Sequence, residues 1–188
     1  MAFLRRENQF WDGAAPSPKW GVLLTAALFG LLVVAAANHF GPTARALINL
    51  PAMILLAIAA IVDLQWKVIP DWLTLPGLAW TLLASAFLGR PRLGEALLGL
   101  ALCGGVLLLM ALISRGSIGG GDVKLVAMIG AMLGWRWGFG VFAFAQLCAA
   151  AFALCLFLAG RKGRKDALPF GPFLSAFGSL ALLGNPMQ

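Results

Sequence analysis

Charged side chains are scarce in this sequence of 188 residues. They make up 11% of the chain, and 61% of its residues are hydrophobic, whereas about 25% charged residues is usual for a soluble domain. The mean hydropathy is +0.92. A water-soluble core of this size cannot enclose so much apolar surface, so most of the chain is expected to lie in lipid.

Cysteine and histidine are too few to build the sites for which they are usually responsible. The cysteines lie inside apolar segments without a Cys-x-x-Cys pair, so neither a zinc site nor a disulfide framework is indicated; they are Cys103, Cys148 and Cys155. The single histidine, His39, ends an apolar run and is expected at the outer membrane interface. A Ser-His or Cys-His nucleophile at the cytoplasmic face would then lack its base. We expect no metal and no cofactor.

The net charge of +7 does not indicate nucleic-acid binding in this chain. The basic residues lie in short connectors between apolar runs, which is the pattern that membrane orientation requires. The first residues are polar and contain proline, whereas a cleaved signal peptide places its apolar stretch closer to the start. We expect a short cytoplasmic tail at residues 1–19 and a single membrane-embedded domain at residues 20–188, with its first helix retained.

Apolar runs long enough to consider as membrane helices recur along the chain. A helix needs about 20 apolar residues to cross a hydrocarbon core about 30 Å thick. The runs are 20–39, 47–62, 72–89, 94–113, 122–134, 138–159 and 167–184. The fifth run is short, because its residues at about 1.5 Å each span only about 20 Å. It either crosses with help from Trp135 and Trp137 at its outer end or is re-entrant.

The distribution of basic residues favours seven crossings. With the N-terminus in the cytoplasm, the cytoplasmic basic residues are Arg5, Arg6, Lys19, Lys67, Arg115, Lys124, Arg161, Lys162, Arg164 and Lys165. The outer ones are Arg45, Arg90, Arg92 and Arg136. This bias follows the positive-inside rule, and it collapses if the fifth run does not cross. We predict an all-α polytopic membrane protein with about seven (six to seven) transmembrane helices, whose basic cluster at residues 161–165 contacts anionic lipid.

Glycine is frequent inside the apolar runs. Small residues allow membrane helices to approach closely, and the candidates are Gly99, Gly104, Gly105, Gly130 and Gly134. No internal repeat and no strand pattern is present, which indicates one helical domain.

Most of the seven acidic residues have structural explanations. Glu7 and Asp12 fall in the tail, and Asp166 follows a basic loop. Glu95 opens the fourth run, where a carboxylate interacts favourably with the helix dipole. Asp71 precedes the third run, so we expect it to cap that helix.

Asp63 and Asp122 have no such simple explanation. Asp63 ends an apolar run, where the helix dipole opposes a negative charge, and Asp122 begins the fifth run. Both are predicted at the cytoplasmic boundary, where they are either functional groups or interfacial residues solvated by headgroups and water. The preceding Gly119, Gly120 and Gly121 remove side chains beside Asp122, which lets a substrate backbone approach; alternatively they form a flexible turn.

Two neighbouring carboxylates indicate a defined chemistry. They share a proton, because both cannot ionise comfortably a few ångströms apart in a low-dielectric cavity. The ionised member activates a water while the protonated one hydrogen-bonds the scissile carbonyl. Since the pair titrates as a unit, the proton is not assigned to either aspartate. The glycine run has neither the GK[ST] ending of a phosphate loop nor the preceding strand of a dinucleotide site.

Three segments of the chain match known sequence motifs. Residues 63–78, DLQWKVIPDWLTLPGL, contain an aspartate that precedes an Ile-Pro-Asp/Asn-x-Leu-Thr stretch, and they include Pro70. Residues 119–134, GGGDVKLVAMIGAMLG, contain a GxGD motif, and residues 168–178 read LPFGPFLSAFG. These segments resemble, in the same order, two motifs and the start of the last helix of the type IV prepilin peptidase family.

The resemblance implies an aspartic endopeptidase of the bacterial inner membrane that serves type IV pili or protein secretion. It implies removal of the leader from prepilins or pseudopilins at the cytoplasmic face, after a glycine, with Asp63 and Asp122 as the catalytic pair. Long-form members also methylate the new N-terminus with S-adenosylmethionine, and they carry an additional N-terminal region. We expect this chain to resemble the short, peptidase-only form of tight-adherence pilus systems, because its first helix begins near residue 20.

Alternative interpretations remain open. Lys67, Arg115 and Lys124 flank the proposed site, where they either attract an acidic substrate residue or set the topology; we favour topology. The chain is alternatively a small ion or proton transporter, which predicts ionisable residues near the middle of the bilayer. As a non-catalytic assembly subunit, it would tolerate the loss of both aspartates.

Overall fold

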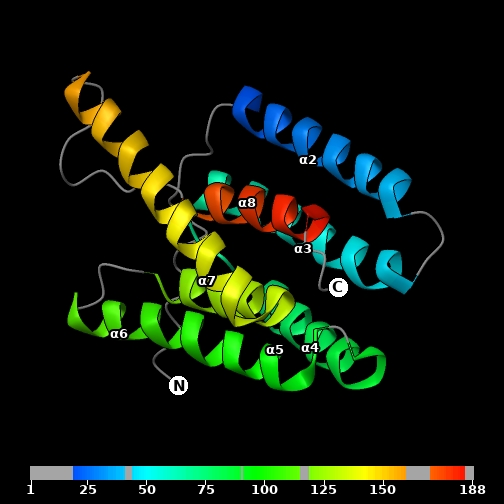
Figure 1. Ribbon diagram of the computed structural model, residues 1–188. Helices are drawn as coiled ribbons and strands as arrows, with labels where there is room; N and C mark the ends of the chain where they lie inside the picture. The colour runs from blue at the N-terminus through cyan, green and yellow to red at the C-terminus, as the bar shows by residue number, and fades with distance from the viewer. Residues whose placement is uncertain (1–18, 41–43, 90, 115–118, 160–169, 185–188) are drawn as a thin grey trace.

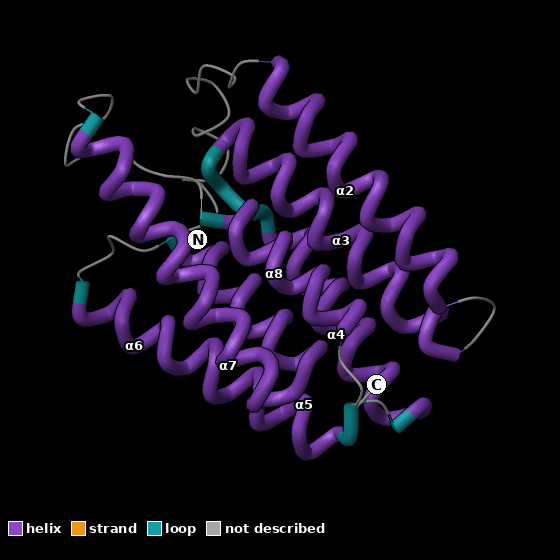
Figure 2. Tube along the Cα trace, turned by 45° about the horizontal axis from the view of Figure 1, so that its top comes forward, coloured by secondary structure: helices purple, strands orange, loops and turns teal. Residues whose placement is uncertain are grey.

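The computed structural model describes residues 19–40, 44–89, 91–114, 119–159 and 170–184. These parts of the chain are helices joined by short connections, and they contain no strand (Figures 1 and 2). The all-α prediction is therefore confirmed. The predictions for the tail, for Arg115 and for the basic cluster at residues 161–165 lie outside the described residues.

The helices follow the apolar runs. They are α2 (Lys19–Phe40), α3 (Ala44–Trp66), α4 (Asp71–Leu88), α5 (Leu93–Gly99), the π-helical turn η1 (Leu100–Gly104), α6 (Gly105–Ile113), α7 (Gly120–Leu158) and α8 (Gly171–Gly184). α5, η1 and α6 follow one another without a break and together occupy the fourth predicted run. α7 covers the fifth and the sixth.

A sharp bend at Gly134 divides α7 into two arms. Gly134 has φ 75° and ψ 169°, a left-handed conformation that glycine adopts without steric cost. A β-carbon on Gly138 would lie 2.7 Å from the Cα of Gly130. In a straight helix, residues eight apart are separated by about 12 Å. The arms therefore fold back on each other, and Figure 1 shows the second arm leaving the bend toward the upper left. The fifth and sixth predicted elements are distinct, while the number of crossings stays a prediction.

The outer surface of the bundle is apolar. Within the described residues, four stretches are long and apolar enough to cross a membrane by length and composition: Val22–His39, Ile48–Trp66, Leu93–Ile113 and Gly120–Cys155. Large apolar side chains such as Phe87 and Ile113 are 83% and 81% exposed. Lipid is the solvent that such a surface requires, and the chain is a polytopic membrane protein.

The core lies between α3, α8 and the first arm of α7. Half of the stretch Ile48–Trp66 is buried, against 11% of Val22–His39, so α3 is central and α2 peripheral. Fully buried side chains come from all three central elements: Met53, Leu56, Leu125, Met128, Ile129 and Leu174. α8 packs against both α3 and α7, and the end of α3 and the starts of α7 and α8 all lie toward the left in Figure 1.

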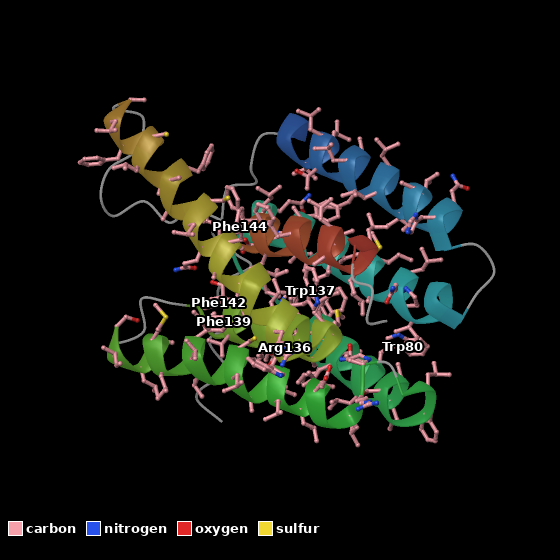
Figure 3. The ribbon with its side chains drawn as sticks, in the orientation of Figure 1. Trp80, Arg136, Trp137, Phe139, Phe142 and Phe144 are labelled. Atoms are coloured by element: carbon pink, nitrogen blue, oxygen red, sulfur yellow. The ribbon has the colours of Figure 1, made fainter. Side chains whose placement is uncertain are left out.

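Aromatic residues surround the bend and the second arm of α7. Arg136 lies over the ring of Trp135, 5.2 Å from its centroid, and Figure 3 shows Arg136 and Trp137 beside the bend. Tryptophan and arginine are typical of membrane interfaces, in line with the predicted outer end of the fifth run. Along the second arm, Phe144 packs edge to face on Phe177 of α8, with their ring centroids 5.7 Å apart.

Glycine allows backbone-to-backbone contact between α5, η1 and α7. A β-carbon on Gly99 would collide with the carbonyl group of Gly130, and one on Gly104 would lie 2.7 Å from the β-carbon of Ala127. A β-carbon on Gly105 would face open space. The predicted close approach is confirmed at Gly99, Gly104 and Gly130, and it is wrong at Gly105.

Gly99→Ala should destabilise the fold, because the added methyl group meets backbone atoms of Gly130 that cannot rotate away. We expect the free energy of unfolding to fall by about 1–3 kcal/mol, the usual cost of overpacking. Titration with SDS, followed by circular dichroism, measures it. Gly105→Ala, in the continuous stretch of α5, η1 and α6, is the matched control and should unfold at the wild-type SDS fraction or above. Equal unfolding of the two variants would contradict this packing.

Candidate active site

Asp63 is a buried carboxylate in the last turn of α3. It is 4% exposed, and its Oδ2 accepts a hydrogen bond of 2.7 Å from the backbone N–H of Gly171. Gly171 begins α8, so this N–H is one of the donors that a helix leaves unpaired at its N-terminus. The positive end of the α8 dipole thus faces a carboxylate that the α3 dipole disfavours. This burial is at odds with solvation of Asp63 by headgroups and water.

Asp122 lies in the first turn of α7 at the same end of the bundle. It is half-buried, and Asp63 is an electrostatic neighbour of its carboxyl group. The carboxyl groups of the two aspartates that the sequence singled out thus interact electrostatically, although α3 and α7 are far apart in the chain. Two carboxyl groups a few ångströms apart can share a proton and activate a water. Among the described residues, no three His, Cys, Asp or Glu side chains gather as a metal site.

The three glycines before Asp122 have different surroundings. A β-carbon on Gly121 would lie 2.7 Å from the carbonyl oxygen of Ile69 and 2.9 Å from its β-carbon. One on Gly120 would meet nothing within 4 Å, and one on Gly119 would lie 3.4 Å from Oδ2 of Asp122. The backbone that approaches Gly121 therefore belongs to this chain. The flexible-turn alternative is wrong for Gly120 and Gly121, since both are helical.

The connection between α3 and α4 passes beside Asp63. Lys67 follows α3 with φ 53°, and its N–H donates to the carbonyl of Asp63 at 2.8 Å. This left-handed conformation costs a non-glycine residue about 1–2 kcal/mol. The exposed Lys67 ammonium is an electrostatic neighbour of the Asp63 carboxylate. Pro70 is buried and extended, and it precedes α4. Lys67 and Pro70 thus both lie in the connection next to Asp63.

Lys124 pairs with Asp71 rather than with either candidate catalytic aspartate. Its ammonium group contacts Oδ1 of Asp71, which joins the first turns of α7 and α4. The expected helix-capping role of Asp71 is wrong, because Pro70 holds the N-cap position and Asp71 is already helical. Both side chains are more than one-third exposed, so the pair contributes at most about 1 kcal/mol. It links α4 to α7 beside the site.

Glu95 lies away from the two aspartates. It is in the first turn of α5, which confirms its predicted place, and its carboxylate lies beside Gly134 at the bend of α7. Of the acidic residues in the described parts of the chain, Asp63 and Asp122 are the two whose carboxyl groups interact with each other.

Sequence reasoning missed Gly171 and Ile69 as parts of the site. Both contribute backbone atoms, which carry no recognisable residue type. The Gly-Pro pair at the start of the last apolar run is the one available signal for Gly171, since proline is frequent in the first turn of a helix.

Comparisons with known proteins point to one family. A model of the type IV leader peptidase family matches residues 50–154. The chain is 36% identical over 165 residues to a prepilin leader peptidase/N-methyltransferase of Burkholderia pseudomallei, covering 84% of this chain and 53% of that protein. It is 32% identical over 161 residues to one of Bacillus subtilis, covering 86% and 63%. The chain thus spans little more than half the length of these relatives. No solved structure matches it.

Gly121→Ala should force the connection between α3 and α4 away from α7, because its methyl group would meet the backbone of Ile69. We expect a stability loss of about 1–3 kcal/mol, measured as a lower thermal midpoint by tryptophan fluorescence in detergent. The neighbouring Gly120→Ala faces open space and should melt at or slightly above the wild-type temperature. A lower midpoint for Gly120→Ala than for Gly121→Ala would refute this packing.

Proposed function

Since the chain belongs to the type IV leader peptidase family, we propose that it is a membrane-embedded endopeptidase that removes the leader from prepilins or pseudopilins. The observation that carries this proposal is the electrostatic interaction between the carboxyl groups of Asp63, at the end of α3, and Asp122, at the start of α7. The relatives are named prepilin leader peptidase/N-methyltransferases. The proposal covers only the peptidase reaction, because hydrolysis is the chemistry that an aspartate pair supports.

In the proposed mechanism, the two aspartates act on a water molecule between them. The ionised carboxylate takes a proton from the water, which attacks the scissile carbonyl, while the protonated carboxyl group hydrogen-bonds the carbonyl oxygen. The aspartate that gained the proton then delivers it to the leaving amine. The electron pair of the C–N bond leaves with that amine, and no covalent intermediate forms. The open space at Gly120 and the exposed Gly119 leave room for a substrate backbone beside Asp122.

We place the site at the cytoplasmic face of the bacterial inner membrane, with the N-terminus on the same side. The excess of basic residues in the connectors on that side supports this orientation. The meeting of both aspartates at one end also favours a protease over an ion carrier, which would require ionisable groups deeper in the bilayer.

Asp63→Asn and Asp122→Asn should each abolish leader removal, because an amide can neither act as the base nor share the proton. We expect cleavage of a prepilin, with purified protein in nanodiscs, to slow by at least about 10²- to 10⁴-fold. Glu95→Gln is the matched control, since it neutralises an acid at the bend of α7 and should cleave at the wild-type rate. Cleavage at the wild-type rate by either aspartate variant, with intact folding, would contradict the assignment of Asp63 and Asp122 as the catalytic pair.

Cleavage should also persist in the presence of a chelator, because two carboxylates suffice to activate the water. The measurement is the initial rate of prepilin cleavage with and without EDTA, after dialysis of the enzyme. A loss of activity that added Zn²⁺ or Mg²⁺ restores would contradict the metal-free mechanism.

A further inference from the structure

We propose that Gly171 is a positioning residue that holds the carboxylate of Asp63 through its backbone N–H and through its lack of a side chain. This inference rests on the proposed function of the aspartate pair. It assigns a role in the site to α8, an element that offers no acid or base of its own.

The hydrogen bond satisfies two groups that would otherwise be costly to bury. Leu174 N–H bonds to the carbonyl of Phe170 at 3.3 Å, so Phe170 occupies the N-cap position and Gly171 is the first helical residue. No residue within α8 can accept from the N–H of Gly171, because an α-helix leaves its first donors unpaired. The buried Oδ2 of Asp63, 2.7 Å away, accepts this bond. Each group thus finds its partner across the α3–α8 contact.

The same contact leaves no room for a side chain at position 171. A β-carbon there would lie 2.7 Å from Oδ2, 2.8 Å from Cβ and 2.9 Å from Cγ of Asp63. Real β-carbons essentially never approach other heavy atoms closer than 3.0 Å. Since the Cβ of Asp63 is fixed to the α3 backbone, rotation of the aspartate cannot relieve the clash. Any residue other than glycine must displace either the carboxylate or the start of α8.

Gly178, two turns further along α8, shows the contrast. A β-carbon on Gly178 would lie 3.2 Å from Cδ1 of Leu56, the far end of a flexible side chain. That neighbour can move by a few tenths of an ångström, whereas the atoms facing Gly171 cannot. The requirement for glycine at 171 is therefore specific to the place where α8 meets the carboxylate.

The hydrogen bond from Gly171 to Oδ2 restrains the orientation of the Asp63 carboxylate. A carboxylate restrained in this way needs no reorientation when the substrate arrives. Misplacement of a reacting group by about 1 Å can slow an enzyme about 100-fold, so positioning of this kind affects turnover more than substrate affinity.

Two variants separate the hydrogen bond from the space. Replacing the amide linkage of Gly171 by an ester, through incorporation of glycolic acid in cell-free synthesis into nanodiscs, removes the N–H and adds no side chain. Gly171→Ala keeps the N–H and adds the methyl group. We expect kcat for prepilin cleavage to fall at least about tenfold in both variants, with KM changed less than about twofold. Gly184→Ala, also in α8 but facing open space, should keep wild-type values.

The outcomes distinguish this inference from the proposed function. If wild-type protein does not cleave the prepilin, the proposed function fails. If wild type cleaves and the folded ester variant keeps its kcat, or loses activity only through KM, the positioning role of Gly171 is overturned. Thermal melting checks the folding of each variant. Because the ester adds no atom that clashes, it decides the question even if Gly171→Ala does not fold.

Discussion

Backbone groups in lipid must find hydrogen-bond partners within the protein, because the bilayer core supplies none. A chain that is 61% hydrophobic therefore folds as helices, and a helix leaves backbone groups unpaired where it begins and where it ends. The site described here lies at such a place. At the N-terminus of α8, the N–H of Gly171 has no acceptor within its own helix. The carboxylate of Asp63, at the end of α3, accepts a hydrogen bond from it. This one hydrogen bond therefore gives the buried N–H of Gly171 an acceptor and restrains the carboxylate of Asp63.

Glycine is what permits these contacts, but its effect depends on what lies opposite. At Gly99 the neighbour is the backbone of Gly130, which brings α5 against α7. At Gly121 it is the backbone of Ile69, which brings the α3–α4 connection against the start of α7. Gly120, one residue away, faces open space. Neighbouring glycines in one motif thus have different roles: one maintains the packing of the site, and the other leaves access to it.

The acidic residues in the described parts of the chain have either a structural role or a proposed role in the reaction. Lys124 and Asp71 join α7 to α4, and Glu95 lies at the bend of α7. The other two acidic residues of the described parts, Asp63 and Asp122, come from α3 and α7, which both pack against α8. The relatives of the chain are named prepilin leader peptidase/N-methyltransferases. Membership of this family, together with the two carboxyl groups, underlies the proposed peptidase function. The engagement of Asp63 with α8 adds a third element to a site that has two reactive residues.

The sequence by itself determined the helices, because the hydrophobicity of a local segment decides whether that segment enters lipid, where it must be helical. The outer bounds of the predicted runs lie within four residues of the observed helix ends, and counting crossings placed Asp63 and Asp122 at the same end. Tertiary structure alone decided which backbone meets which side chain. The pairing of Lys124 with Asp71 joins residues 53 apart, and that of Gly171 with Asp63 joins residues 108 apart. Such contacts depend on how helices pack against one another. The residue pattern of a single helix does not identify the residues that it will contact on another helix.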